Sequence, residues 1–304
     1  MDARITRQRL ANMLSYDWLK ILGAIALAAV FFCVFFLMIG VRPTDGQKFY
    51  VYTYNGLTAG GDFSMLENNL KENDVFGYDI LDTGTESFKS GGLYGNSVFT
   101  ARRSAGEGRV MFVNDVRTTN EDGSVSSALL DSFMENEGTP NERFGLFLDP
   151  EQFLADCKSY LADFFGENLD GEINHEKARE TFLKRNAKDA RFRSSSKKAA
   201  GVLLEEERLE KLKTDYLFVS ASIGQELDYV TYTTEQKEHT IGFSMNSLNL
   251  TSLVFYTVEE QGATVKKSSD IALCIFNNGT REGDLRYESV NFLAYLLRTY
   301  GTPQ

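Results

Sequence analysis

Residues 47–54 read QKFYVYTY and residues 109–114 read RVMFVN, and these two stretches decide the class of fold. Both are rich in β-branched and aromatic residues, which fit the pleated, half-buried surface of a strand. A shorter run of the same kind, YDIL at 78–81, lies between them and is also predicted to be a strand. The first part of the folded chain therefore supplies three strands to one sheet.

Two helices are predicted between these strands. The first covers 64–73, where Ser64 and Glu67 fit a capping box, and the second covers 96–105. The stretch 83–95, rich in Gly, Ser and Thr, is predicted to be a loop. Strands and helices that alternate at this spacing indicate an α/β fold, with parallel strands joined by crossover helices.

Upstream of the first strand, residues 21–41 read ILGAIALAAVFFCVFFLMIGV and contain no charged side chain. A helix of about 20 apolar residues spans the hydrocarbon core of a bilayer. Residues 1–20 hold four basic and two acidic side chains, so we expect the N-terminus in the cytoplasm. A cleaved signal peptide is the competing interpretation, although its apolar region is shorter than this run. The sequence thus predicts a single-pass anchor in the cell membrane and an extracytoplasmic domain at 45–304.

Downstream of the third strand the pattern is mostly helical as far as residue 227. We predict helices at 126–135, 150–165, 175–198 and 202–220, from the spacing of their apolar residues. Strand-like runs return at 239–245, 252–258 and 271–276. A final amphipathic helix is predicted to begin at Asp284 and to end before Gly301.

The charge of the chain excludes one class of partner. The chain has 32 basic and 43 acidic residues, and the first 44 residues account for five basic and two acidic ones. The remaining 27 basic and 41 acidic residues give the folded part a net charge of −14, which disfavours nucleic acid. Within it, residues 177–198 hold nine basic and two acidic residues. We interpret that segment as a docking site for a partner protein or as a solvated helix balanced by acidic neighbours, with docking residues Lys184, Arg185 and Lys188.

Catalytic and metal-binding motifs are absent from the sequence. The stretch 166–177 resembles a calcium-binding loop, but Gly166 and Lys177 occupy the two end positions where acidic ligands are needed. Cys157 and Cys274 form either one disulfide or two free thiols, which sequence alone leaves open. We therefore expect no enzymatic activity, no cofactor and no metal.

Several stretches together resemble a known family. KFYVYTYNG looks like an opening strand, VFGYDILDT like a second strand, and ARRSAGEGRVMFVND like a helix, turn and third strand. ALCIFNNG and YESVNFLAYLLRTYG resemble a late return to the same sheet with its packing helix. The order is similar to extracellular solute-binding proteins of the type 2 periplasmic-binding fold. The resemblance implies a mixed-sheet lobe at 47–120 and 270–304, and a helix-rich second lobe at 121–269. Two features depart from the family: the uncleaved helix anchor and the small second lobe.

The predicted strand ends carry polar side chains. In open parallel sheets ligands bind beyond the carboxyl ends of the strands. Amides, hydroxyls and one carboxylate at those ends suit a neutral polar or cationic ligand, although the same residue types also favour turns. The candidate ligand-binding residues are Tyr54, Asn55, Thr83, Thr85, Asn114, Asp115, Asn277 and Asn278.

Two functions follow as hypotheses. The first is a membrane-tethered extracytoplasmic binding module that takes a small polar solute and acts with a membrane transporter or envelope complex. The second is a structural or interaction subunit of a membrane protein complex that binds no small ligand. A surface hydrolase, the third class, would need a catalytic constellation that the sequence lacks.

Overall fold

A computed structural model of the chain forms two compact units, Met1–Arg42 and Pro43–Gln304. The residues that the structure describes are 8, 18–39, 43–54, 56–88, 95–123, 125–136, 145–233 and 238–301.

The first unit contains helix α2, Trp18–Ile39. Among the described residues it is the one helix that is long and apolar enough to cross a membrane, and its side chains from Trp18 to Phe35 are exposed. It covers nearly the same residues as the predicted span 21–41. An apolar helix left uncovered by protein is stable when lipid covers it.

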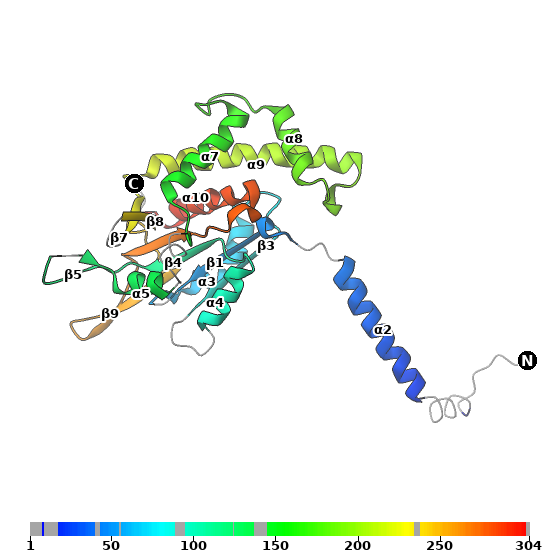
Figure 1. Cartoon of the computed structure of the whole chain (residues 1–304), viewed down its shortest axis with the longest axis horizontal. Coiled ribbons are helices and arrows are strands. Elements are labelled where there is room, and N and C mark those ends of the chain that lie inside the picture. Colours follow the sequence, from blue (N-terminus) through cyan, green and yellow to red (C-terminus); the bar gives the residue numbers. More distant parts are fainter. Residues whose placement is uncertain are drawn as a thin grey trace, which may run out of the picture. The chain divides into compact units, whose positions relative to one another are not determined.

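The second unit is built on a six-stranded mixed sheet in the order β3-β1-β4-β11-β8-β7 (Figure 1). β1 pairs in parallel with β3 and with β4, whereas β11 runs antiparallel between β4 and β8. β7 closes the sheet as an antiparallel partner of β8. The strands are β1 Lys48–Thr53, β3 Asp82–Ser87, β4 Val110–Asn114, β7 Asp228–Thr233, β8 Glu238–Ser244 and β11 Ile271–Ile275.

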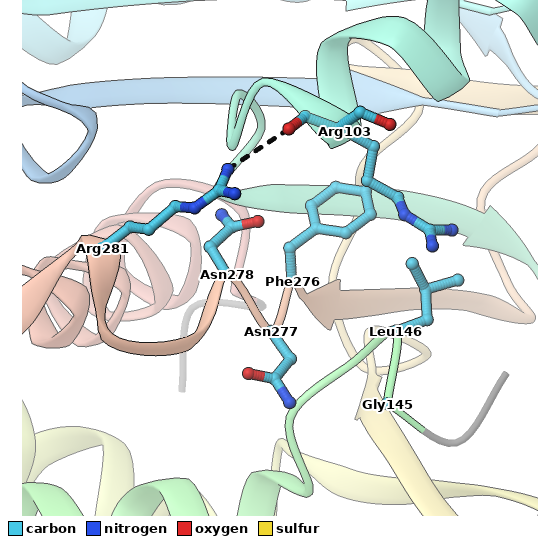
Figure 2. Close-up of a pocket in the computed structure, with 8 residues that line it drawn as sticks. Arg103, Gly145, Leu146, Phe276, Asn277, Asn278 and Arg281 are labelled. Atoms are coloured by element: carbon cyan, nitrogen blue, oxygen red, sulfur yellow. Dashed lines mark hydrogen bonds between the residues drawn. The ribbon is translucent and has the colours of Figure 1, made fainter. Parts of the chain in front are cut away.

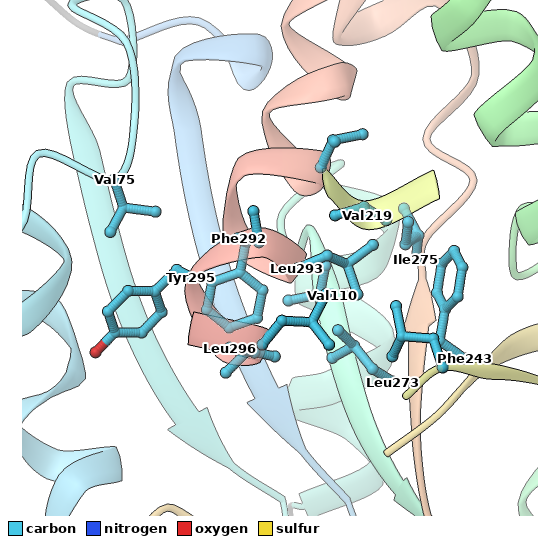
Figure 3. Close-up of a cluster of buried hydrophobic side chains, with 14 of the residues drawn as sticks. Val75, Val110, Val219, Phe243, Leu273, Ile275, Phe292, Leu293, Tyr295 and Leu296 are labelled. Carbon is cyan, nitrogen blue, oxygen red and sulfur yellow. The ribbon is translucent and has the colours of Figure 1, made fainter. Parts of the chain in front are cut away.

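Side chains alternate between the two faces of this sheet and bury both. On one face, Val110 and Leu273 pack against Phe292 and Leu296 of helix α10, Glu288–Tyr300 (Figure 3). On the other face, the central strands contribute to an aromatic core with helices α4, Gly95–Ser104, and α5, Ala128–Asn136. Both faces are therefore removed from water, which is the usual state of a sheet with parallel strands.

A layer of three helices packs beyond α10. α9, Ser195–Ser222, lies against α10, and both α7, Pro150–Phe165, and α8, His175–Arg185, pack on α9 (Figure 1). Helix α3, Gly61–Glu72, joins β1 to β3. Cys157 and Cys274 are two buried free thiols, so the disulfide alternative is not realised.

The strand predicted at 78–81 is wrong. Those residues form a turn, and the strand that pairs with β1 is β3, which begins at Asp82 and lies mostly in the stretch 83–95 that is predicted to be a loop. β3 is an edge strand of sequence DTGTES, and most of its residues are only partly buried. Because an edge strand does not need apolar side chains on both faces, hydrophobicity does not reveal it.

The helix predicted at 175–198 is two helices. α8 ends at Arg185, and α9 begins at Ser195 after a short 3₁₀ turn, Ala190–Phe192. The Ser194 side chain accepts a hydrogen bond from the Lys197 backbone amide and thereby caps α9. Asp189 caps the 3₁₀ turn in the same way. Short polar side chains compete with the helix for backbone groups, which explains the break.

The C-terminal part also differs in detail from the prediction. Asp284 lies in a 3₁₀ turn, Gly283–Tyr287, and α10 begins four residues later, although it ends before Gly301 as expected. A small three-stranded sheet in the order β10-β9-β2 contains strand β10, which was not predicted. Its strands are β2 Thr58–Ala59, β9 Val254–Glu260 and β10 Ala263–Lys267, and a hairpin follows β4 with strands β5 Thr118–Thr119 and β6 Val125–Ser126.

The α/β class and the mixed sheet agree with expectation, but the sheet crosses the predicted lobe boundary. β7 and β8 come from residues 121–269, and they extend the same sheet as β4 and β11. Helices α7 to α9 come from the same segment and pack against α10. The division of 45–304 into two lobes remains a prediction.

Candidate functional site

The predicted ligand residues lie at opposite ends of the sheet. Asn114 and Asp115 follow the carboxyl end of β4. Because β11 is antiparallel to β4 and Ile275 pairs with Val110, Asn277 and Asn278 lie near the start of β4 instead. The prediction treated all strands as ending on one edge, and this holds only for parallel neighbours.

Two other predicted residues lie inside a strand, not at its end. Thr83 pairs with Phe49 and Thr85 with Val51, whereas β3 ends at Ser87. The Thr83 side chain is buried, and its hydroxyl has no hydrogen-bond partner among the described residues. Asn55 lies outside the residues that the structure describes.

The residues at the end of β1 and β4 are committed to internal contacts. The ring of Tyr54 is buried, 4.5 Å from the ring of Phe133 between their centroids. The amide nitrogen of Asn114 donates to the carbonyl oxygen of Gly56 at 3.3 Å, and its oxygen accepts from the backbone amide of Val116 at 2.9 Å. These contacts hold the turns beyond the strands, which is the role expected of Asn where a chain reverses.

Asp115 is the one carboxylate of the predicted set. Its oxygens accept hydrogen bonds from Nε of Arg117 at 3.0 and 3.2 Å. Burial raises the pKa of Asp115, and the charge of Arg117 opposes that change without cancelling it. Since Arg117 neutralises Asp115, a cationic ligand would have to displace it.

A pocket of about 280 Å³ lies beside Asn277 and Asn278 (Figure 2). Two arginines, Arg103 at the end of α4 and Arg281 in the 3₁₀ turn Gly279–Arg281, are the charged residues that line it. Among the described residues, the lining consists of Arg103, Ser104, Gly145, Leu146, Phe276, Asn277, Asn278 and Arg281.

A tight loop positions the polar side chains of this pocket. Asn277 accepts a hydrogen bond from the Gly279 backbone amide at 3.2 Å, and Gly279 has φ of +64°, a conformation that glycine adopts without strain. The amide nitrogen of Asn278 donates to the carbonyl oxygen of Gly108 at 2.8 Å. Nη1 of Arg281 donates to the carbonyl oxygen of Ser104 at 3.2 Å, which joins the loop to the end of α4.

A buried ion pair lies beneath the loop. Nη1 of Arg109 is 2.7 Å from Oε2 of Glu282, and both side chains are almost fully buried. The other oxygen of Glu282 accepts from Asn278 at 2.6 Å. Burial raises the pKa of Glu282, and Arg109 opposes the change. Because Arg109 and Glu282 neutralise each other, this buried pair adds no net charge beneath the pocket.

The three predicted docking residues lie in different environments. Lys184 and Lys188 are exposed, but the Arg185 guanidinium is 16% exposed. It contacts Asp284 at 2.5 Å, Asp79 at 2.7 Å and Glu205 by a further short ion pair. Arg185 therefore joins α8 to α9 and to the loops beside the sheet, and its docking role stays a prediction.

A second arginine completes this buried network. Arg208 of α9 is fully buried and lies 2.9 Å from Glu205 and 3.1 Å from Glu288 of α10, measured between nitrogen and oxygen. Burial alone raises the pKa of Glu205, but Arg208 and Arg185 outweigh it and hold this pKa below its usual value. The same two arginines lower the pKa of Asp284 against the effect of burial.

Sequence reasoning missed Arg103 and Arg281, which lie at a helix end and in a loop. Two local patterns could have indicated them: the pair RR at 102–103 and the glycine-containing segment NNGTREG at 277–283. Within the described ranges, no three His, Cys, Asp or Glu side chains gather in a way that could hold a metal ion.

No known protein family model, no curated protein and no solved structure matches this chain. The fold and the pocket therefore define it by themselves as an α/β domain that follows a helix apolar enough to cross a membrane.

Proposed function

We propose that the chain is a membrane-tethered extracytoplasmic binding module, and that its ligand is a small polar solute with an anionic group. The observation that carries the proposal is the pocket that Arg103, Arg281 and two asparagines line. Arginine presents its donors in a fork that matches a carboxylate or phosphate, and asparagine adds both donors and acceptors. The charge of the pocket favours an anion over the neutral or cationic ligand that the sequence suggested.

The topology supports the solute-binding resemblance without deciding it. β11 returns late in the chain to lie beside β4, and α10 then packs on the sheet, in the order that the resemblance implies. In such a module α2 would hold the domain at the cell membrane beside a transporter or envelope complex, with its N-terminus in the cytoplasm.

Thermal unfolding of the full chain in detergent tests the proposal. The panel consists of phosphate, sulfate, dicarboxylates, amino acids, sugars, polyamines and calcium. A ligand at 100 times its dissociation constant adds about 2.7 kcal/mol of stability, which shifts the melting temperature by several degrees. We expect a shift with an anion, and we expect Arg281→Gln to abolish that shift. A shift with polyamines or calcium alone would reject the pocket as the site.

The alternative function, an interaction subunit without a small ligand, is favoured by a different observation. Tyr54, Asn114 and Asp115 are all committed to internal contacts, so the carboxyl end of the parallel strands offers few free polar groups. Of the predicted docking residues, Lys184 and Lys188 remain exposed. Cross-linking and co-purification from native membranes, with both lysines reversed to Glu, tests this alternative, because loss of a captured partner would support it.

A further inference from the structure

Six exposed cations lie on α8, on the first turn of α9 and on the connection between them, in a folded unit of net negative charge. None of them makes an ion pair with a residue that the structure describes. Within 177–198 the two acidic residues are Glu180, which is exposed, and Asp189, which is bound to Arg191 at 2.8 Å. We call this cluster the basic surface; it consists of Arg179, Lys184, Lys188, Arg193, Lys197 and Lys198.

Part of the basic surface opposes the dipole of its own helix. Arg193, Lys197 and Lys198 lie at the N-terminus of α9, and the first turn of that helix contains no acidic residue. Cations are unfavourable at a helix N-terminus because the unpaired backbone amides there carry partial positive charge. The stability of the fold therefore does not explain why cations occupy this position. Binding of an external anion would explain it.

Two residues of the basic surface line a groove of about 500 Å³ between α8 and α9. Arg179 and Lys198 line the groove with their charges, and Leu183, Ala199 and Val202 supply apolar area. Next to it, Leu203 is 61% exposed. A shallow groove with cations and short apolar side chains fits the charged and uncharged parts of a phospholipid headgroup, and it offers too little apolar area for insertion of the helix into the bilayer.

The chain enters the folded unit next to the basic surface. Asp189, in the connection between α8 and α9, accepts a hydrogen bond from the side chain of Gln47, just before β1. Only three residues separate the end of α2 at Ile39 from Pro43, and four residues of chain span at most about 14 Å. If α2 crosses a bilayer, the region around Gln47 is therefore held near the bilayer surface.

We propose that the basic surface binds the anionic headgroups of the bilayer that α2 crosses, and so fixes which side of the domain faces the membrane. Charge attraction of this kind acts within about one Debye length, roughly 8 Å at physiological salt, which is the range that the short connection imposes. The inference rests on the anchor and is independent of the pocket at Arg103 and Arg281. It leaves that pocket and the β9–β10 hairpin for other partners.

Amine acetylation followed by mass spectrometry tests the inference on the full chain. The chain is placed in nanodiscs of phosphatidylcholine, or of phosphatidylcholine with about 30% phosphatidylglycerol. We expect acetylation of Lys197 and Lys198 to be at least about threefold slower in the anionic discs, and about 0.5 M salt to remove that protection. Lys266 on β10 lies on the separate three-stranded sheet, so its rate should not change and it serves as the internal control.

A charge-reversal variant locates the effect. Lys197→Glu with Lys198→Glu should remove the protection of Lys184 and Lys188 in anionic discs, whereas Lys266→Glu should leave it intact. Equal rates in the two kinds of disc would overturn the inference. Slow acetylation of Lys197 and Lys198 that is unchanged in neutral discs or at high salt would overturn it as well. Protein, and not anionic lipid, would then cover these two lysines.

Discussion

Lys184 and Arg185 are neighbours at the end of α8, and their environments are opposite. Lys184 is exposed and belongs to the basic surface, whereas Arg185 is 16% exposed and contacts three carboxylates. One charge is available to a partner outside the domain, and the other connects the helical layer to the loops beside the sheet. The comparison shows that one run of basic residues contains both exposed and buried charges, which the sequence does not separate.

The chemistry of the two residue types accounts for the division. A guanidinium presents five donors in a rigid plane, so Arg185 bonds Asp79, Glu205 and Tyr78 at the same time. An ammonium is compact and strongly hydrated, and Lys184 stays in water. In the basic surface, by contrast, lysine and arginine serve equally as sources of charge.

The largest expected effect is at the centre of the buried network. Arg208→Ala leaves Glu205 and Glu288 without their main cation in a site closed to water, and loss of one partner from a buried pair costs about 3–5 kcal/mol. Urea unfolding of the full chain in detergent should show this loss. Lys184→Ala, the matched control on the surface, should change stability by about 0.5 kcal/mol or less. Equal effects of the two variants would contradict the distinction between them.

Acid should weaken the network before it affects the basic surface. Glu205 and Asp284 have a lower pKa in the folded chain than their usual values of 4.5 and 3.8. The unfolded chain thus binds more protons, and the stabilisation that exists above these values is lost as pH falls below them. Glu282, whose pKa is raised, has the opposite sign and offsets part of the loss.

Melting temperatures between pH 3 and pH 7, a range chosen to bracket the usual carboxyl pKa values, check this behaviour. We expect a steep fall at the acid end for the wild-type chain and a shallower fall for Asp284→Asn. The exposed Glu207→Gln is the control and should follow the wild-type curve. A wild-type curve that is flat down to pH 3 would show that the network does not stabilise the fold through charge.

A smaller effect is expected at the pocket. Arg281→Gln removes the hydrogen bond to the Ser104 carbonyl at the end of α4, and a hydrogen bond of this exposed kind contributes about 1 kcal/mol. The urea midpoint should fall slightly, and any anion-dependent increase of the melting temperature should disappear. Lys197→Glu, which is remote from the pocket residues in sequence, should keep the full anion response.

The smallest effect should have the opposite direction. Lys197→Glu replaces a cation with an anion at the N-terminus of α9, where the helix dipole favours negative charge. We expect a gain of about 0.3–1 kcal/mol at low salt, measured from the urea midpoint. Lys213→Glu, later in the same helix, would lose its ion pair with Glu210 and should give no gain. A loss of stability at Lys197 would mean that its charge already has a structural role.

Local patterns predicted the elements that bury apolar side chains. β1, β4 and β11 are nearly the predicted strands, and α7 has the predicted bounds because Asp149 and Pro150 mark its start and Gly166 its end. They failed at β3, whose edge position allows polar residues, and at the break between α8 and α9. They did not place the candidate ligand residues on one edge, because the direction of β11 puts Asn277 and Asn114 at opposite ends of the sheet, and the binding role of these residues stays a prediction.

The sequence by itself determined the apolar helix, the α/β class and the basic character of 177–198, since these depend on composition and on periodicity within a few residues. Only the tertiary structure decided which of those cations are buried and where the polar strand ends meet. Arg185 bonds with Asp79 and Asp284, which are 106 and 99 positions away in the chain, and Arg109 forms an ion pair with Glu282 on a distant turn. The environment of a charge is set by such long-range neighbours, and a local pattern contains no information about them.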